Sequence, residues 1–229
     1  MADVDTFMAG SSRASKIFYA VIRAIVVGAS VGYTRTTVIG KHNIPNNGAF
    51  LLAPIHRSNI DTPLAAAVTG RRMRFMGKDS IWKFGPIGWV LSALGAFPVT
   101  RGSADREALK RCIAVLEAGE PLVLFPEGTR QSGPIVQPLF DGAAYVAVKA
   151  GVPIIPVGIG GSERVMKKGG KMIYPRKCVV IVGTPMTAST DATGRVPRSA
   201  VKDLTHSLSL ELQRLFDEAQ VKAGCPNQK

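Results

Sequence analysis

Short runs rich in Val, Ile and Leu alternate along the chain with stretches whose apolar residues repeat at helical spacing. The runs of strand length lie at residues 36–40, 48–54, 73–77, 96–100, 121–126, 152–159 and 178–183. The helical patterns lie at residues 62–69, 86–94, 103–118, 140–150 and 199–222. Apolar strands separated by helices are typical of a sheet that is buried on both faces. The alternation therefore predicts an α/β fold with a mostly parallel central sheet and helices on both faces.

The segment before the first expected strand, residues 13–33, reads RASKIFYAVIRAIVVGASVGY. At 3.6 residues per turn, Arg13, Lys16 and Arg23 lie on one side of a helix. Most of the apolar residues lie elsewhere on the cylinder: Ile17, Phe18, Val21, Ile22, Ala24 and Ile25. This pattern predicts an amphipathic helix in the membrane interface, with its basic side toward the headgroups. A soluble helix packed on the core and a true membrane span are the alternatives.

The domain organisation follows from the length of the chain and from this first helix. A chain of 229 residues with 46% hydrophobic content is long enough to bury one full core. Neither a linker nor a repeat divides the chain after the first helix. We therefore expect a membrane-association helix within residues 1–35, followed by one domain over residues 36–229.

The charge balance indicates an anionic partner, because 29 Lys and Arg residues against 16 Asp and Glu residues give a formal charge of +13. Two basic patches carry few acidic residues: Arg71, Arg72, Arg74 and Lys78, and Arg164, Lys167, Lys168, Lys171, Arg176 and Lys177. Both can also be read as solvated faces and loops. Neither patch has interleaved aromatics or a known nucleic-acid motif, so nucleic acid is not the favoured partner. An anionic membrane surface and phosphorylated substrates remain.

The cysteines predict neither a metal centre nor a disulfide framework. Cys112, Cys178 and Cys225 are widely scattered, with no CxxC spacing and no paired histidine. The chain begins MADVDTFMAG, which lacks the basic start and the cleavage site of a secretory signal. We therefore expect a reducing environment inside the cell and a site without metal.

The stretch APIHRSNIDTPL, residues 53–64, places a histidine directly after an apolar run. Pro63 is tolerated only in the first turn of a helix, so the helix must begin near residues 59–62 and His56 must lie in the loop before it. From there Asp61 can accept a hydrogen bond from one imidazole nitrogen, which leaves the other nitrogen as a base. Such a pair can deprotonate a substrate hydroxyl directly.

Simpler interpretations exist for both residues of this pair. Ser58-x-x-Asp61 also has the spacing of a helix capping box, and a strand-end histidine can be satisfied by the backbone alone. A serine nucleophile is a weaker alternative. The GxSxG match GASVG, residues 28–32, falls within a helical stretch, whereas a nucleophile elbow needs a strand before the serine.

Two further segments place polar groups just after expected strands. In LVLFPEGTRQSG, residues 122–133, Pro126 ends a strand and is followed by Glu127, Gly128, Thr129 and Arg130. Such a turn lies where α/β sheets usually bind ligands, and an arginine there can grip a phosphate with two hydrogen bonds. In GAFPVTRGSADREAL, residues 95–109, Arg101 follows a strand in the same way. An internal Glu–Arg pair and a surface cation are the respective alternatives.

Taken together, these segments resemble the glycerolipid acyltransferases. HRSNID resembles the HxxxxD block of that family, FPVTRG its second block, FPEGTR its third and VPIIPVGI its apolar fourth. All four occur in order between residues 56 and 159, and the branch most similar to them is that of the bacterial 1-acyl-sn-glycerol-3-phosphate acyltransferases. One departure is Ile55, where the family often has an asparagine before the histidine.

The resemblance implies a role for each matching residue. His56 would be the general base and Asp61 its orienting partner; Glu127, Gly128, Thr129 and Arg130 would shape the acceptor site. Arg101 would bind the acceptor phosphate, and Lys78 in FMGKDSIW would touch it as well.

The resemblance also implies a reaction, transfer of an acyl chain to the sn-2 hydroxyl of lysophosphatidic acid. No cofactor is expected, since acyl-CoA or acyl carrier protein would be the co-substrate. The expected location is the cytoplasmic face of the cell membrane. Transfer to glycerol 3-phosphate at sn-1 or to another lysophospholipid is the alternative reaction. A basic lipid-binding or nucleic-acid-binding module is the alternative without catalysis.

Overall fold

The computed structural model describes residues 12–93, 95–99, 106–170, 172–188, 190–191 and 194–228. Among these, seven strands form one sheet: β1 (Thr37–Ile39), β2 (Leu51–Pro54), β3 (Arg74–Lys78), β4 (Ala96–Val99), β5 (Leu122–Val123), β6 (Ile154–Gly160) and β7 (Val179–Val182). Their order across the sheet is β1-β7-β6-β2-β5-β3-β4. All neighbours are parallel except β6 and β7. The mostly parallel sheet predicted from the apolar runs is therefore confirmed.

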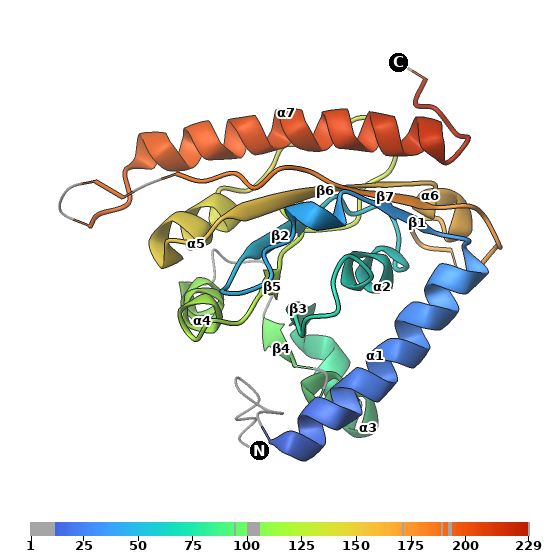
Figure 1. The fold of residues 1–229 in the computed structure, drawn as a ribbon, viewed down its shortest axis with the longest axis horizontal. Coiled ribbons are helices and arrows are strands. Elements are labelled where there is room, and N and C mark those ends of the chain that lie inside the picture. Colours follow the sequence, from blue (N-terminus) through green and yellow to red (C-terminus); the bar gives the residue numbers. More distant parts are fainter. Residues whose placement is uncertain are drawn as a thin grey trace.

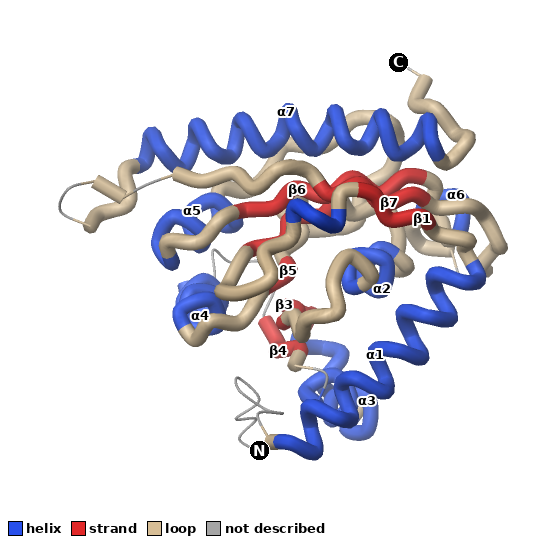
Figure 2. Tube along the Cα trace, in the orientation of Figure 1, coloured by secondary structure: helices blue, strands red, loops and turns tan. Residues whose placement is uncertain are grey.

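The helices of the described residues are α1 (Arg13–Tyr33), α2 (Asp61–Ala66), α3 (Gly85–Ala93), α4 (Arg106–Glu117), α5 (Gly142–Ala150), α6 (Ser162–Val165) and α7 (Arg198–Lys222). Two 3₁₀ helices, η1 (Lys41–Asn43) and η2 (Asp79–Lys83), connect them. In Figure 1, α7 lies on one side of β6 and β7 and α2 lies on the other. Figure 2 shows the strands between these helices. Helices thus cover both faces of the sheet, as the sequence predicts; α6, η1 and η2 were not expected.

The long helix α7 packs unusually close to β6 because of two glycines. A Cβ atom on Gly158 would lie 2.4 Å from the backbone carbon of Leu215, and one on Gly160 would lie 2.2 Å from backbone atoms of Ala219. Contacts that short do not occur between real atoms, so only glycine permits this packing. Helix packing therefore explains the glycines at positions 158 and 160 of β6.

The first helix, α1, presents an apolar surface to solvent. Ile17, Val21 and Ile25 are 66%, 52% and 61% exposed, and they lie one turn apart along one side of the helix. Tyr19 points the other way and is buried against the protein. By length and composition alone, the segment Lys16–Tyr33 would also be able to cross a membrane. The helix predicted for residues 13–33 is present, with its apolar side uncovered.

The basic side of α1 does not face solvent throughout. The Arg23 guanidinium turns inward and donates to the backbone oxygens of Ala66, at 2.8 Å, and Thr69. Ala66 is the last residue of α2 and Thr69 lies in the turn after it, where the last carbonyls of a helix lack partners and favour a cation. Arg13 and Lys16 remain exposed.

The parallel strands β2, β5 and β3 are neighbours, so their carboxyl ends lie at one edge of the sheet. The loop that leaves β2 and the turn that leaves β5 emerge side by side there. This is the edge at which open α/β sheets bind ligands.

Candidate active site

The site begins at the loop between β2 and α2. All four residues of β2 are buried, and the chain turns out of the sheet at Ile55 and His56. The following helix begins at Asp61, so Pro63 lies in its first turn. The helix start predicted from this proline is therefore confirmed, and His56 lies in the loop before the helix.

The His56 and Asp61 side chains meet across this loop. His56 Nδ1 lies 3.2 Å from Asp61 Oδ2. The same carboxylate oxygen accepts hydrogen bonds from the backbone N–H groups of Arg57 and Ser58, both at 2.6 Å. These two donors fix the orientation of the carboxylate. The Asp61 carboxylate accepts a hydrogen bond from Nδ1–H, so the imidazole is held in the tautomer whose Nε2 is a base.

Only part of the capping-box interpretation of Ser58 and Asp61 is met. The Asp61 carboxylate accepts from the Ser58 N–H, as in a capping box. The Ser58 hydroxyl instead donates to the backbone oxygen of Met166 at 2.8 Å, which ties the loop to the segment after α6. Asp61 therefore holds the start of α2 and contacts the imidazole at the same time.

The imidazole is also held from one side by an aromatic ring. The rings of His56 and Phe125 stack with their centroids 4.0 Å apart and their planes 24° apart. The His56 side chain is 12% exposed, and that of Asp61 is fully buried. The base thus keeps a small opening to solvent while its partner is shielded.

Beneath this pair lies a buried ion pair that the sequence analysis did not identify. Arg57 and Glu127 are both almost fully buried, and Arg57 Nη1 lies 2.8 Å from each oxygen of the Glu127 carboxylate. Glu127 also accepts from the N–H of His56 at 2.9 Å and from that of Gln137 at 3.1 Å. Arg57 in addition donates to the backbone oxygen of Ile135. This network joins the loop after β2 to the turn after β5.

Glu127 was predicted to shape the acceptor site, and the structure places its carboxylate inside the protein with protein donors around it. Its effect on an acceptor is therefore indirect, through the loop that carries His56. Arg57 follows β2 and Glu127 follows β5, and the two side chains meet because these strands are neighbours in the sheet. The only signal in the sequence was therefore a charged residue of each sign shortly after a buried strand, and the pairing itself depends on the strand order.

The rest of the turn after β5 is open to solvent. Gly128 has a φ of +70°, and a Cβ atom on it would lie 2.8 Å from the Phe140 ring, so the position requires glycine. Gly128 and Thr129 are exposed, and Arg130 is half-buried. Within the described part of the chain the Arg130 guanidinium has no hydrogen bond or ion pair. The N–H of the next residue, Gln131, donates to the His56 backbone oxygen at 2.8 Å, so the turn adjoins the base.

The two remaining predicted residues belong to neighbouring segments. Lys78 is the last residue of β3, so its backbone reaches the same edge of the sheet as the ends of β2 and β5. Arg101 lies outside the described residues, and its predicted contact with phosphate stays a prediction. Where the structure is described, no three His, Cys, Asp or Glu side chains gather as metal ligands do.

Fold and site together define an α/β protein with an oriented His–Asp base at the carboxyl edge of a mostly parallel sheet. The sequence model of the family described as Acyltransferase matches residues 35–160. That match covers more than half of the chain, and the chain therefore belongs to the Acyltransferase family.

Individual relatives support this assignment. The chain is 30% identical, over 65% of its length and 72% of the relative's, to the 1-acyl-sn-glycerol-3-phosphate acyltransferase of Bacillus subtilis. It is 29% identical to the chloroplastic enzyme BAT2 of Brassica napus over 69% of this chain, and it spans about half the length of this and a second chloroplastic relative. The crystal structure of the acyltransferase PlsC from Thermotoga maritima matches with a TM-score of 0.68 at 25% identity, over 86% of this chain and 80% of that one.

Proposed function

We propose that this protein transfers an acyl chain from an acyl thioester to the sn-2 hydroxyl of lysophosphatidic acid and so forms phosphatidic acid. The observation that carries the proposal is the contact between His56 Nδ1 and the buried Asp61 carboxylate, which prepares Nε2 as a base. The names of the relatives from Bacillus subtilis and Thermotoga maritima support this acceptor. Phosphatidic acid formation makes the protein part of phospholipid biosynthesis.

The reaction needs one proton transfer in each direction. His56 Nε2 takes the proton of the acceptor hydroxyl while the hydroxyl oxygen attacks the thioester carbonyl carbon. The tetrahedral intermediate then collapses, the carbon–sulfur bond breaks, and the leaving thiolate takes the proton back from the imidazolium. Asp61 stabilises the imidazolium between the two steps. Neither a covalent acyl-enzyme nor a cofactor is required.

The oxyanion of the intermediate needs N–H donors. At the helix start, the N–H groups of Arg57 and Ser58 already bind Asp61. Because those two N–H groups are already in use, the turn after β5 is the favoured source of N–H donors to the oxyanion.

The acceptor carries a phosphate, and the cations at this edge of the sheet suit it. We assign the phosphate to Arg130, which lies next to Gln131 in the turn that is hydrogen-bonded to the His56 backbone, together with Arg101 and Lys78. Thr129 and Gly128 border this phosphate site, and the buried Glu127 supports the turn that carries them. The thioester carrier is coenzyme A or acyl carrier protein, both of which are anionic and suit a chain of charge +13.

We assign the protein to the cytoplasmic face of the cell membrane, where residues 1–35 form the membrane-association part and residues 36–229 the acyltransferase domain. The uncovered side of α1, with Ile17, Val21 and Ile25, supports attachment, because its apolar surface would be buried among acyl chains. Both the acceptor and the product are lipids of that surface.

A panel of acceptors tests the proposal. Release of free thiol from acyl-CoA and from acyl carrier protein is measured with lysophosphatidic acid, glycerol 3-phosphate and lysophosphatidylcholine. We expect the highest turnover with lysophosphatidic acid and none with the His56→Ala variant, whose unfolding temperature stays within a few degrees of wild type. Wild-type turnover by His56→Ala would refute the mechanism. A preference for glycerol 3-phosphate would show that this compound, and not lysophosphatidic acid, is the acceptor.

A further inference from the structure

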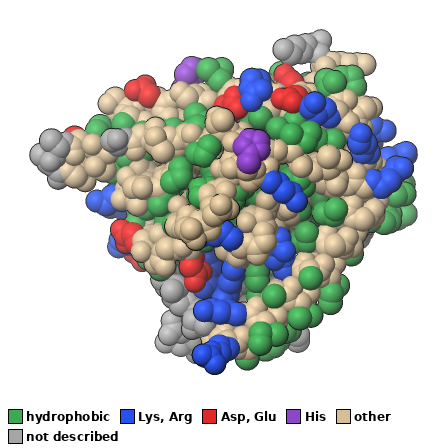
Figure 3. Space-filling model, viewed as in Figure 1, with side chains coloured by type: hydrophobic (Ala, Val, Ile, Leu, Met, Phe, Trp, Pro, Cys, Tyr) green, Lys and Arg blue, Asp and Glu red, His purple; other side chains and the backbone are tan. Residues whose placement is uncertain are grey.

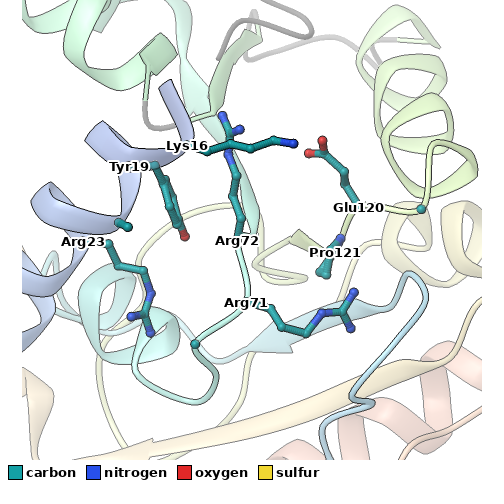
Figure 4. A pocket seen from close by; sticks show the side chains of 10 residues that line it. Lys16, Tyr19, Arg23, Arg71, Arg72, Glu120 and Pro121 are labelled. Carbon is teal, nitrogen blue, oxygen red and sulfur yellow. The ribbon is translucent and has the colours of Figure 1, made fainter. Parts of the chain in front are cut away.

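A second candidate binding site lies at the edge of the sheet opposite His56. A hollow of about 500 Å³ separates α1 from the segments that lead into β3 and β5 (Figure 4). These segments, residues 70–72 and 119–121, precede their strands, so the hollow lies at the amino edge of the parallel sheet. The candidate active site lies at the carboxyl edge, and the two are therefore separate.

The lining of this hollow is strongly basic. It includes the cations Lys16, Arg23, Arg71 and Arg72, with Glu120 as the one carboxylate among the lining residues. Glu120 is ion-paired with Arg74, whose Nη2 lies 3.0 Å from its Oε1, and it also attracts Arg72, so this one carboxylate is shared among several cations. In Figure 3, Lys and Arg side chains gather beside α1 on this face of the molecule. The hollow therefore carries an excess of positive charge.

Two of these cations, Arg71 and Arg23, are held in place by neutral backbone groups. Arg71 donates to the backbone oxygens of Pro45 at 2.9 Å and Gly48 at 2.5 Å, as Arg23 does to the end of α2. The Arg72 guanidinium lies 5.3 Å from the centre of the Tyr19 ring. Carbonyl oxygens and an aromatic ring orient a guanidinium without cancelling its charge. The positive groups are thus preorganised around the hollow.

The pKa of Arg72 agrees with this excess of positive charge. Its pKa is lowered from the ordinary value, first by burial and then by repulsion from Arg74. An anion in the hollow would relieve that repulsion.

We propose that this hollow binds the phosphate of an anionic phospholipid headgroup. The argument for a lipid comes from α1, which lines the hollow with Lys16, Tyr19 and Arg23. A different side of the same helix exposes Ile17, Val21 and Ile25. When that side enters the acyl chains, the hollow lies at the depth of the headgroups. The inference rests on the proposed membrane attachment of α1 and adds a site that recognises the charge of the membrane.

The test compares binding to vesicles of phosphatidylcholine alone and with one fifth phosphatidylglycerol. The variant Lys16→Gln/Arg72→Gln removes two cations of the hollow and leaves its structural arginines. Because each basic residue near an anionic surface contributes about one tenfold step or less in affinity, we expect the variant to lose roughly 10- to 30-fold for the anionic vesicles. Its binding to phosphatidylcholine vesicles should match that of wild type.

The matched control is Arg198→Gln/Lys202→Gln, which removes one arginine and one lysine from the exposed side of α7, across the sheet from α1 (Figure 1). We expect this control to lose no more than about twofold. Equal losses in the two variants would overturn the proposal, because they would show that only total charge matters. If the first variant unfolds, Lys16→Gln alone, at an exposed position, replaces it.

A second experiment, with a soluble short-chain lipid, distinguishes binding of a lipid headgroup from binding of free phosphate. Calorimetric titration with dihexanoyl phosphatidylglycerol below its micelle concentration should show binding by wild type and by the α7 control, and weaker binding by Lys16→Gln/Arg72→Gln. Equally tight binding of inorganic phosphate by wild type would overturn the assignment to a lipid. Failure of wild type to bind either kind of vesicle would instead count against attachment through α1, so the two failures are distinguishable.

Discussion

Among single residues, Asp61 does most to orient the base. One of its two carboxylate oxygens, Oδ2, contacts the imidazole and two backbone N–H groups. Because the backbone donors come from the loop itself, the carboxylate stays oriented whether or not a substrate is bound. The base is therefore prepared by the fold, and substrate binding need not assemble it.

Asp61→Asn should separate the structural role of this residue from its role toward the base. The amide oxygen can take the place of Oδ2 and still accept from the loop N–H groups, but the neutral amide no longer supplies the negative charge that stabilises the imidazolium. We expect kcat to fall by roughly 10³- to 10⁴-fold, with a small change in unfolding temperature. Asp61→Ala, which removes both functions, is the comparison. The separation of the two roles would be contradicted if Asp61→Asn lost as much stability as Asp61→Ala and yet kept the kcat of wild type.

Arg130→Ala should weaken binding of the acceptor phosphate. We expect KM for lysophosphatidic acid to rise by roughly 10- to 100-fold, since a charged hydrogen-bonded partner is lost, with a smaller change in kcat. Arg198→Ala, at an exposed position of α7, serves as the control. Steady-state kinetics with and without the acceptor phosphate decide the matter, and an unchanged dependence on that phosphate would remove Arg130 from the site.

Local pattern was enough to predict the His56–Asp61 pair, because Pro63 restricts the helix start through backbone geometry alone. It was not enough for Arg57 or Arg23. The partners of these two arginines, Glu127 and the end of α2, are 70 and 43 residues away in sequence. Such partners depend on which strands and helices become neighbours, and a local pattern does not record that.

At the scale of elements, the buried Arg57–Glu127 pair fixes the loop after β2 against the turn after β5. Removing one partner leaves a buried charge alone, which typically costs about 3–5 kcal/mol. We expect Glu127→Gln to lower both stability and kcat, the latter because the group that accepts from the N–H of His56 loses its charge and one of its two acceptor oxygens.

The double variant Arg57→Met/Glu127→Gln tests whether this cost comes from the unpaired charge. It should be more stable than the sum of the two single variants predicts, as chemical denaturation would measure. Additive losses would mean that the two side chains do not act as a pair.

The packing of α7 on β6 gives a second prediction at this scale. Gly160→Ala forces a Cβ against the backbone of α7, so we expect a loss of about 1–3 kcal/mol in the free energy of unfolding. Gly32→Ala is the control, since a Cβ there meets nothing within 4 Å and alanine favours the helical interior of α1. Thermal unfolding compares the two, and equal stability would show that α7 can shift without cost.

At the scale of the whole molecule, the apolar runs predicted all seven strands and the main helices. They did not predict the order of the strands or the reversed direction of β7 against β6. Composition tells a buried strand from an exposed one, but it does not say which strands become neighbours. The order depends on which crossovers pack best, which is a property of the assembled layers.

Thiol reactivity reports the integrity of this assembly. Burial raises the pKa of Cys112 and of Cys178 to about 12, so at pH 8 both remain almost entirely protonated and unreactive. Cys225 is only half-buried. We expect one thiol per native chain to react quickly with an aromatic disulfide reagent at pH 8 and three after denaturation. The Cys225→Ser variant should have no fast-reacting thiol, and two fast thiols in native protein would contradict the core described above.

The pairing of β1 with β7 has a consequence for how the chain is made. β1 follows α1 near the beginning of the sequence, yet its partner strand in the sheet is β7, near the other end. A ribosome releases α1 and β1 long before β7 exists, so β1 stays at an unfinished edge while most of the domain is translated. Throughout that interval the apolar side of α1 is already outside the ribosome. The nascent chain is therefore able to reach a bilayer first and complete its sheet there.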